Sequence, residues 1–194
     1  MGRAHFGTAD FLAAARVLAA ERGPAAVTVG AVVERLKAPV GSFYHRFVSR
    51  DALLGELWLA GVLAFQEGLF AAIETGDGLT AALHMPTWVR ANLDDACLLL
   101  LHNQRDFVQG DWPAALKQGV ADQARRLDDY KARFARSTFC DVGPDQLKRA
   151  QFVLIGAPGS AVHAHLLRRE PPPPLVDELI RVTYYAVVAA ARAG

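Results

Sequence analysis

The segment VTVGAVVERLKAPVGSFYHRFVSRDALLGELW, residues 27–58, decides how the chain folds. Apolar residues recur with helical spacing from 29 to 36, and Thr28 precedes them in the position of an N-cap. Only two residues separate this helix from the next, for which Pro39 suits the first turn because its missing N–H costs nothing there. The segment therefore predicts two short helices joined by a tight turn.

The second of these helices, within APVGSFYHRF (residues 38–47), is rich in residues that form helices poorly. Gly, Ser, Phe and Tyr stand where a surface helix usually carries Ala, Glu, Lys or Leu. Phe43 and Phe47 lie four positions apart, so we expect both to face the preceding helices and to leave residues 42, 45 and 46 pointing outward. Helix propensity therefore does not explain why these residue types occur in this helix.

Helices are also expected on both sides of this segment. An apolar face between Thr8 and Arg22 predicts a first helix, which Gly23-Pro24 ends. Ser49 suits the N-cap of a long helix that runs to about Ile73. No strand pattern of useful length appears, and the remaining helices are expected at about 79–92 with a kink at Pro86, 94–108, 113–139, 145–169 with an interruption at Pro158, and 175–193.

The fold class predicted is thus all-α, with a helix-turn-helix domain over residues 1–50 and a helical domain over residues 51–194. A length of 194 residues with 52% hydrophobic content can bury a real core. The first 50 residues hold seven Lys and Arg against three acidic residues, a formal charge of +4, while the rest carries −3. A basic head on a mildly acidic body suits contact with a polyanion.

The sequence predicts a cytoplasmic protein that does not enter a membrane. No apolar run reaches the roughly 18 residues that a membrane span needs, and the N-terminus lacks the apolar stretch of a secretory signal. Cys97 and Cys140 stand apart without CxxC spacing, so we expect neither a disulfide framework nor a zinc site.

The DNA-binding signature of the TetR (tetracycline repressor) family of bacterial regulators is similar to residues 27–58. The features that carry the resemblance are the Thr28-Val29 opening, the Val32-Val33 pair, the block from Gly41 to Phe47, and the start of the fourth helix at Arg50-Asp51-Ala52-Leu53-Leu54. The resemblance is specific over about residues 8–58. The chain departs from the family pattern at Lys37, where a glycine usually ends the second helix, and at Pro39, where a serine often starts the third.

The resemblance implies a set of DNA-contacting residues, each with a physical use at a duplex surface. Hydroxyls and basic groups contact phosphates, a glycine permits close backbone approach, and an apolar side chain near the helix start can touch a thymine methyl. Arg50 is expected to act as a phosphate clamp. The implied set is Thr28, Pro39, Val40, Gly41, Ser42, Tyr44, His45, Arg46 and Arg50.

The resemblance also implies a homodimer with an internal pocket for a small-molecule effector. Small residues from Gly156 to Ala161, Gly159 among them, would let another helix approach closely, and the last helix is rich in Val, Leu and Ile, so two helices from each chain are expected to form a four-helix bundle. Large residues on the middle helices are candidates for the pocket, among them Trp58, Phe107 and Trp112. From these candidates we select Phe65, Trp88, His102 and Tyr130 as effector-binding residues.

Enzymatic chemistry has little support in the sequence. His163 and His165 lie two apart on an expected helix and so on different faces, which does not suit two ligands of one metal. No nucleotide-binding or nucleophile-elbow motif occurs, and we expect neither cofactor nor metal. The prediction is a ligand-responsive transcriptional repressor that binds palindromic operator DNA as a homodimer and is released by a mainly apolar effector. The alternatives are a small helical enzyme or a helical module that does not bind DNA.

Overall fold

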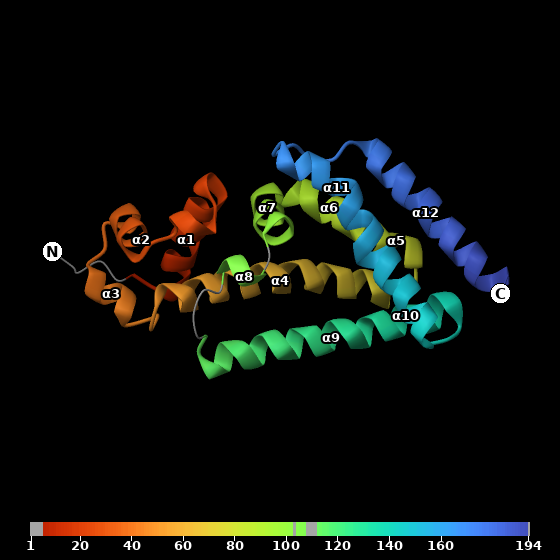
Figure 1. The fold of residues 1–194 in the computed structure, drawn as a ribbon, viewed down its shortest axis with the longest axis horizontal. Helices are drawn as coiled ribbons and strands as arrows, with labels where there is room; N and C mark the ends of the chain where they lie inside the picture. The colour runs from red at the N-terminus through yellow and green to blue at the C-terminus, as the bar shows by residue number, and fades with distance from the viewer. Residues whose placement is uncertain (1–5, 103, 108–111, 194) are drawn as a thin grey trace.

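The structure is a computed structural model and describes residues 6–102, 104–107 and 112–193. Every regular element within those ranges is a helix, which confirms the all-α fold class. Figure 1 shows an elongated molecule with α1 to α3 at one end. The elements are α1 (Thr8–Arg22), η1 (Pro24–Ala26), α2 (Val29–Leu36), α3 (Val40–Tyr44), α4 (Arg50–Glu74), α5 (Gly78–Ala82), α6 (His84–Ala91), α7 (Leu93–Leu101), α8 (Gln104–Phe107), α9 (Ala114–Phe139), α10 (Pro144–Gln151), η2 (Phe152–Gly156), α11 (Ala157–Leu167) and α12 (Pro174–Ala193).

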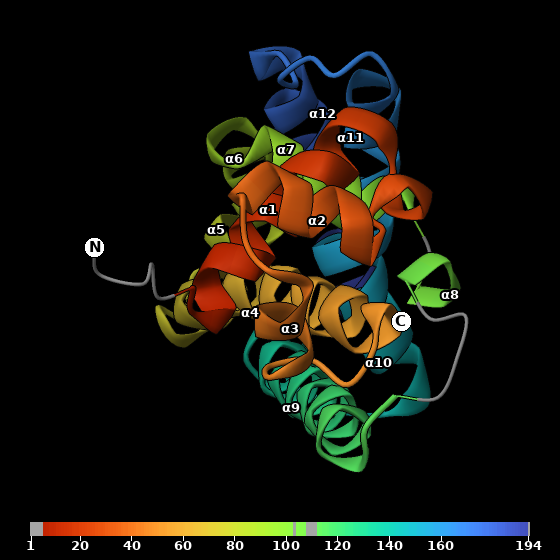
Figure 2. The same cartoon turned by 90° about the vertical axis from the view of Figure 1, so that its left-hand side faces the viewer.

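Three phenylalanines hold α1, α2 and α3 together as a unit that we call the head. Phe11, Phe43 and Phe47 are each at most 1% exposed, and their ring centroids lie 5.4 to 6.1 Å apart. Two of the three pairs meet edge to face, the arrangement that aromatic quadrupoles favour. Phe43 and Phe47 are therefore buried as the sequence predicts, and Figure 2 views the molecule from the head.

The long helix α4 joins the head to the body, which we define as α4 to α12. It begins after Ser49, whose Oγ accepts a hydrogen bond from the N–H of Ala52 at 3.1 Å, as expected for an N-cap. By length and composition α4 could cross a membrane, with a mean hydropathy of 1.4 over 18 residues, although no such segment is expected from the sequence. A core helix passes the same test, and α4 supplies buried side chains to the cores of both head and body.

Prolines divide two of the expected helices into shorter ones. Pro86 lacks an N–H and its ring crowds the carbonyl four residues earlier, so α5 ends at Ala82 and α6 starts at His84 in place of one kinked helix. Before Pro158 the chain forms the π-helical segment η2 between α10 and α11. The helix expected over 94–108 instead ends at Leu101, and α8 follows it.

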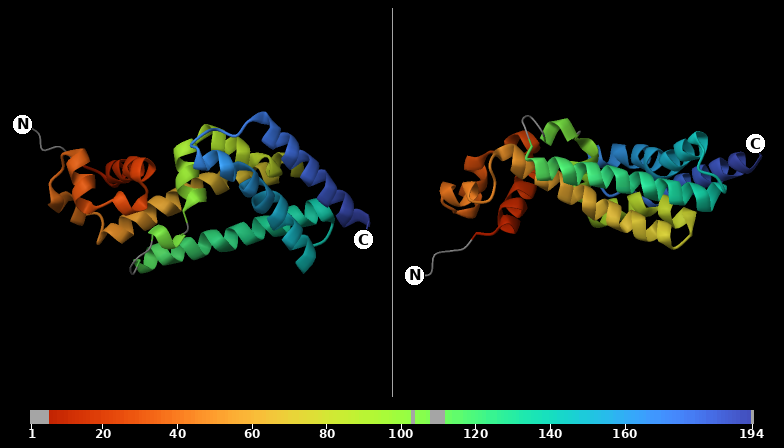
Figure 3. Two further views of the ribbon diagram at one scale, coloured as in Figure 1. Left: turned by 45° about the horizontal axis from the view of Figure 1, so that its top comes forward. Right: turned by 90° about the horizontal axis from the view of Figure 1, so that it is seen from below.

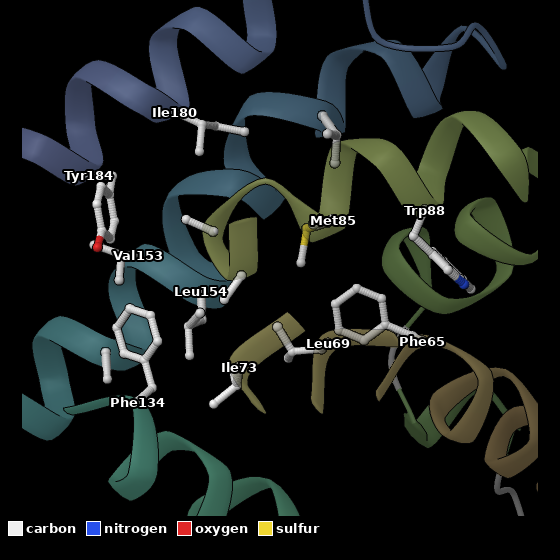
Figure 4. Close-up of a cluster of buried hydrophobic side chains, with 14 of the residues drawn as sticks. Phe65, Leu69, Ile73, Met85, Trp88, Phe134, Val153, Leu154, Ile180 and Tyr184 are labelled. Carbon is white, nitrogen blue, oxygen red and sulfur yellow. The ribbon is translucent and has the colours of Figure 1, made fainter. Parts of the chain in front are cut away.

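The body core lies between α4 and the later helices. Figure 4 shows buried side chains from α4, α6, α9, η2 and α12 converging there, among them Leu69, Met85, Phe134 and Ile180. Figure 3 shows α9 running alongside α4. The two helices approach closely at Gly55, where an added Cβ would lie only 2.5 Å from a methyl carbon of Leu116.

Two arginines tie the head to the body at the first turn of α7. Arg16 of α1 pairs with Asp95 at 3.2 Å. Arg169, which follows α11, donates to Asp94 at 2.6 Å and to the Ala20 carbonyl of α1 at 2.8 Å. The adjacent carboxylates of Asp94 and Asp95 therefore point to different partners, and both pairings restrain α1.

Candidate DNA-binding interface and effector site

The tight turn between α2 and α3 is built around Lys37, whose backbone is left-handed with φ 54° and ψ 37°. Glycine is the usual residue in this conformation because an L side chain is strained there. The N–H of Ala38 donates to the Val33 carbonyl at 2.9 Å and closes the end of α2. The turn thus forms without glycine, and the side chain of Lys37 is left exposed beside α3.

The start of α3 is held by contacts to Pro39. Pro39 is the N-cap of α3 (φ −63°, ψ 141°) and so precedes the first turn, a shift of one residue from the expectation. The backbone N–H and the Oγ of Ser42 both donate to the Pro39 carbonyl, at 2.9 and 2.7 Å. Arg46 donates from Nη1 to the Ser42 carbonyl at 3.4 Å. Ser42 and Arg46 therefore help to shape α3, and the Ser42 hydroxyl oxygen keeps its capacity to accept.

The outer face of α3 presents side chains to solvent. Val40 is 51% exposed and Tyr44 57% exposed, and Gly41 and His45 are exposed as well. The Tyr44 ring packs edge-on against buried Phe43 with centroids 5.3 Å apart, so its ring is anchored while its hydroxyl reaches outward. Figure 1 shows α3 at the head end, away from α11 and α12.

Thr28 has the predicted place at the start of α2. Its Oγ1 accepts a hydrogen bond from the N–H of Ala31 at 3.1 Å, which confirms the N-cap, and the residue is exposed. The first turn of α2 thus presents both a hydroxyl and the positive end of a helix dipole, two features that suit a phosphate.

Among the residues expected to contact DNA, Arg50 has the contacts that differ most from those of its expected role, a phosphate clamp. Its Nε donates to the Val27 carbonyl at 2.5 Å, its Nη2 to the Pro24 carbonyl at 2.9 Å, and its Nη1 pairs with Asp51 at 3.2 Å. The guanidinium therefore braces the start of α4 against the segment between α1 and α2. In this conformation all three guanidinium nitrogens have partners within the chain.

Val48 lies outside the set of predicted DNA contacts, yet it is 76% exposed between α3 and α4. Its signal lay in the helical spacing, because an apolar residue one position after Phe47 cannot share the buried face of Phe43 and Phe47. Lys37, where the chain departs from the family pattern, adds an exposed cation at the same end of the molecule.

Two of the four effector candidates come together in the body core. Phe65 of α4 and Trp88 of α6 are 6% and 8% exposed, and their rings meet edge to face with centroids 5.3 Å apart (Figure 4). Both belong to the same buried cluster. In this structure they pack against each other as core residues.

The other two candidates lie elsewhere. Tyr130 of α9 stacks on Phe70 with centroids 3.9 Å apart and donates from its hydroxyl to Glu74 at 2.5 Å, on the wall of an open groove along α9. His102 follows α7, and its ring lies 6.2 Å from that of Phe107, which packs in the core of the head. The structure therefore does not gather the four residues around one cavity.

A histidine outside the predicted set connects α4 to α6. The Nε2 of His84 lies 2.9 Å from the Phe65 carbonyl, so this nitrogen carries the hydrogen and donates. An added Cβ at Gly68 would lie 2.4 Å from the His84 ring, which shows how closely the ring packs on α4. Burial lowers the pKa of His84 below its usual value, and the hydrogen bond to Phe65 opposes this only in part.

This lowered pKa predicts that acidification destabilises the fold. As the pH falls, His84 takes up a proton in the unfolded chain near its ordinary pKa of about 6.5, and in the folded protein only at a lower pH. The stabilising contribution of His84 is therefore present above about pH 6.5 and is lost below it. The effect is at most about 1.4 kcal/mol per pH unit. Denaturant unfolding of the wild type and of His84→Gln, at pH 7.5 and 5.5, measures it.

His84→Gln keeps a donor for the Phe65 carbonyl but cannot titrate, so its stability should depend less on pH than that of the wild type. His163→Gln, the same substitution at an exposed histidine of α11, is the matched control. Equal pH dependence in the wild type and in His84→Gln would contradict the assignment.

Two short helices joined at a tight turn, with an exposed second helix on a basic head, define a helix-turn-helix DNA-binding protein. The chain matches the family described as bacterial regulatory proteins, tetR family, over residues 11–57. The match covers the head and the start of α4, and it supports a TetR-family transcriptional regulator. No curated protein matches the chain. Among the described residues, no three His, Cys, Asp or Glu side chains are grouped to hold a metal ion.

Proposed function

We propose that the protein is a cytoplasmic, ligand-responsive repressor that binds a near-palindromic operator as a homodimer. The observation that carries this proposal is the exposed outer face of α3, which presents Val40, Gly41, Tyr44 and His45 on the head. One helix of this length contacts too few bases to select a site in a genome. Two copies related by a two-fold axis would read half-sites about 34–36 Å apart.

The proposed DNA contacts fall into two groups. Val40, Gly41 and His45 lie on the face that would enter the major groove and read base edges. Thr28 and Tyr44 are placed to bind phosphates on either side of that groove, by a helix N-terminus and a phenolic hydroxyl. Pro39, Ser42 and Arg46 position α3, and Ser42 and Arg46 add polar groups beside it.

The exposed face of α12 supports the proposed homodimer. Leu175, Leu179, Val182 and Tyr185 are 55 to 68% exposed and recur with helical spacing along one face. Phe152 and Leu167, on the η2–α11 segment, are 48% and 64% exposed. These exposed apolar side chains of α12 and of the η2–α11 segment would form a four-helix bundle with a second copy.

The residues expected at that interface are partly exposed and partly buried: Gly156 and Ser160 are exposed, whereas others contact their own chain. Gly159 is partly exposed, and an added Cβ there would lie 3.8 Å from the sulfur of Met85, in ordinary contact with its own chain. Val176, Ile180 and Val188 of α12 point into the body core and are at most 7% exposed. The neighbouring face of α12 is the one that is exposed to solvent.

DNA binding should depend steeply on salt and moderately on the hydroxyl of Tyr44. The logarithm of the affinity should fall with the logarithm of the salt concentration by roughly 0.9 per phosphate neutralised. Tyr44→Phe keeps the ring packed on Phe43 and removes one hydrogen bond, so it should weaken binding to every sequence by about 3- to 10-fold. Fluorescence titrations of labelled promoter DNA at several salt concentrations measure both effects.

The Arg125→Ala variant is the control for these titrations, because Arg125 lies on α9, outside the head, and pairs with Asp122. It should leave affinity and salt slope unchanged. Tyr44→Phe with wild-type affinity at all salt concentrations would remove Tyr44 from the proposed interface. A chain that ignores duplex DNA and instead turns over a small molecule would favour the enzyme alternative.

A further inference from the structure

The positive charge of the head is concentrated in one stretch of the chain. Residues 1–34 hold three Lys and Arg against three acidic residues, so their formal charges cancel. Residues 35–50, which include the turn between α2 and α3 and the whole of α3, hold four Lys and Arg and no Asp or Glu. The entire excess of +4 in the first 50 residues therefore lies on and beside the helix proposed to read DNA.

The three arginines among these four cations have partners within the chain. Arg35 pairs with Glu21 at 3.5 Å. Arg46 donates to a backbone carbonyl of α3 at 3.4 Å, and Arg50 donates to two carbonyls between α1 and α2. The fourth cation, Lys37, is exposed and forms no ion pair with any residue that the structure describes. Its charge is available to a partner outside the chain.

The backbone at Lys37 favours glycine, so a lysine there has a cost. With φ 54° and ψ 37° the residue is left-handed, and its Cβ crowds the following carbonyl. The helix dipole favours a cation at this end of α2, but by less than the strain costs. Arg169 has the same φ of 54°, and there the side chain donates to the Ala20 carbonyl at 2.8 Å and to Asp94 at 2.6 Å. Lys37 has no comparable contact among the described residues.

Lys37 lies directly before the helix proposed to enter the major groove. Only Ala38 and Pro39 separate it from Val40, in the first turn of α3. In helix-turn-helix proteins the side chains of this turn contact base edges, and the phosphates that border the groove lie beside them. A lysine side chain is a point charge on a flexible four-carbon stem, which suits a phosphate and needs no fixed geometry. Figure 1 shows α2 and α3 together at the end of the molecule.

We propose that Lys37 binds a phosphate of the DNA backbone beside the groove that α3 enters. A contact of this kind adds affinity for every sequence and does not select bases. The inference rests on the proposed binding of DNA. It adds a contact outside the set that the family resemblance implies, because glycine is the usual residue of the family at this position.

Lys37→Gly separates the charge from the fold. Glycine adopts the left-handed conformation without strain, so the variant should melt at or above the wild-type temperature. On a labelled duplex of arbitrary sequence, the slope of log affinity against log salt should become shallower by about 0.9 per bound copy, since one counterion fewer is released. At about 0.1 M salt this loss corresponds to roughly eightfold weaker binding per copy.

Two further variants separate the charge from the backbone. Lys37→Arg keeps the charge and the same strain, so it should keep the wild-type salt slope. Lys37→Asn has no charge and tolerates the left-handed conformation, so its slope should match that of Lys37→Gly. Arg35→Ala is the matched control, because it removes a nearby exposed cation that already pairs with Glu21, and it should leave the slope unchanged.

The salt slopes decide between a phosphate contact and the alternatives. A wild-type slope in Lys37→Gly would overturn the proposal, and early melting with that slope would assign Lys37 to the fold. An equal loss of slope in Arg35→Ala would indicate a general effect of charge on the head and would also overturn it. A wild type that does not bind duplex DNA would reject both this contact and the repressor. The expected slopes without any preference for promoter DNA would reject only the repressor.

Discussion

Val182→Glu should convert the protein from a dimer into monomers. Val182 is 68% exposed near the middle of α12, between Leu179 and Tyr185 on the same apolar face. In a two-fold interface the substitution occurs in both copies, so two carboxylates would be buried close together without partners. The cost exceeds about 3 kcal/mol, which corresponds to a more than 100-fold weaker dimer.

Light scattering at micromolar concentration distinguishes the two states. The wild type should have a mass of about 42 kDa, twice that of the 21.0 kDa chain, and Val182→Glu should have the mass of one chain. Val17→Glu makes the same chemical change at a residue of α1 that is 36% exposed, and it should stay dimeric. A monomeric wild type, or a dimeric Val182→Glu, would reject the interface.

Loss of the dimer should also lower operator affinity by a large factor. Each head alone contacts half of the site, and the two-fold arrangement supplies the second half-site without further entropy cost. The Val182→Glu protein should therefore bind a full operator hardly better than a half-site. The stability of the monomer is measured separately from its affinity for the operator. Val182 makes no contribution to the core of its own chain, so its substitution should leave the fold of each chain intact.

Local signals in the sequence predicted the head well. The caps of α2 and α4 follow from Thr28 and Ser49, because a side chain oxygen in that position bonds a nearby N–H whatever the rest of the chain does. The burial of Phe43 and Phe47 follows from their spacing. These features depend on residues within four positions of one another, so a pattern of residues is enough to find them.

Features that depend on distant residues were not predictable in the same way. The sequence indicated an interruption at Pro158 but not that the turns before it would be π-helical. Phe65 and Trp88 meet because α4 and α6 pack together, whereas Tyr130 and His102 are held by other neighbours. Aromatic residues spaced along helices indicate a core but do not tell which of them share a cavity.

Arg50 is the sharpest example, because its partners lie 23 and 26 positions earlier in the chain. From sequence it is a cation at a helix start, which is a plausible ligand for phosphate. In the structure the same guanidinium bonds two carbonyls of the α1–α2 connection and so holds the helix-turn-helix against α4. The two roles make different predictions for substitution by alanine and by lysine.

As a brace, Arg50 should be needed for stability. Arg50→Ala leaves the Pro24 and Val27 carbonyls without these donors and should lower the free energy of unfolding by about 2–3 kcal/mol. For a chain of this size the melting temperature should fall by roughly 4–12 °C. Arg50→Lys keeps the charge but lacks the planar fork that reaches two carbonyls, so it should lose most of the same stability.

Arg35→Ala is the matched control, since Arg35 is another arginine of the head whose exposed pair with Glu21 at 3.5 Å contributes less than about 1 kcal/mol. Thermal unfolding and promoter titrations on the same samples separate the two roles of Arg50. If Arg50→Lys melted like the wild type while Arg50→Ala lost only DNA affinity, the phosphate clamp would be right and the brace wrong. If both variants melt early and Arg35→Ala does not, Arg50 acts on DNA through the position of the head, by fixing where α4 begins against α2.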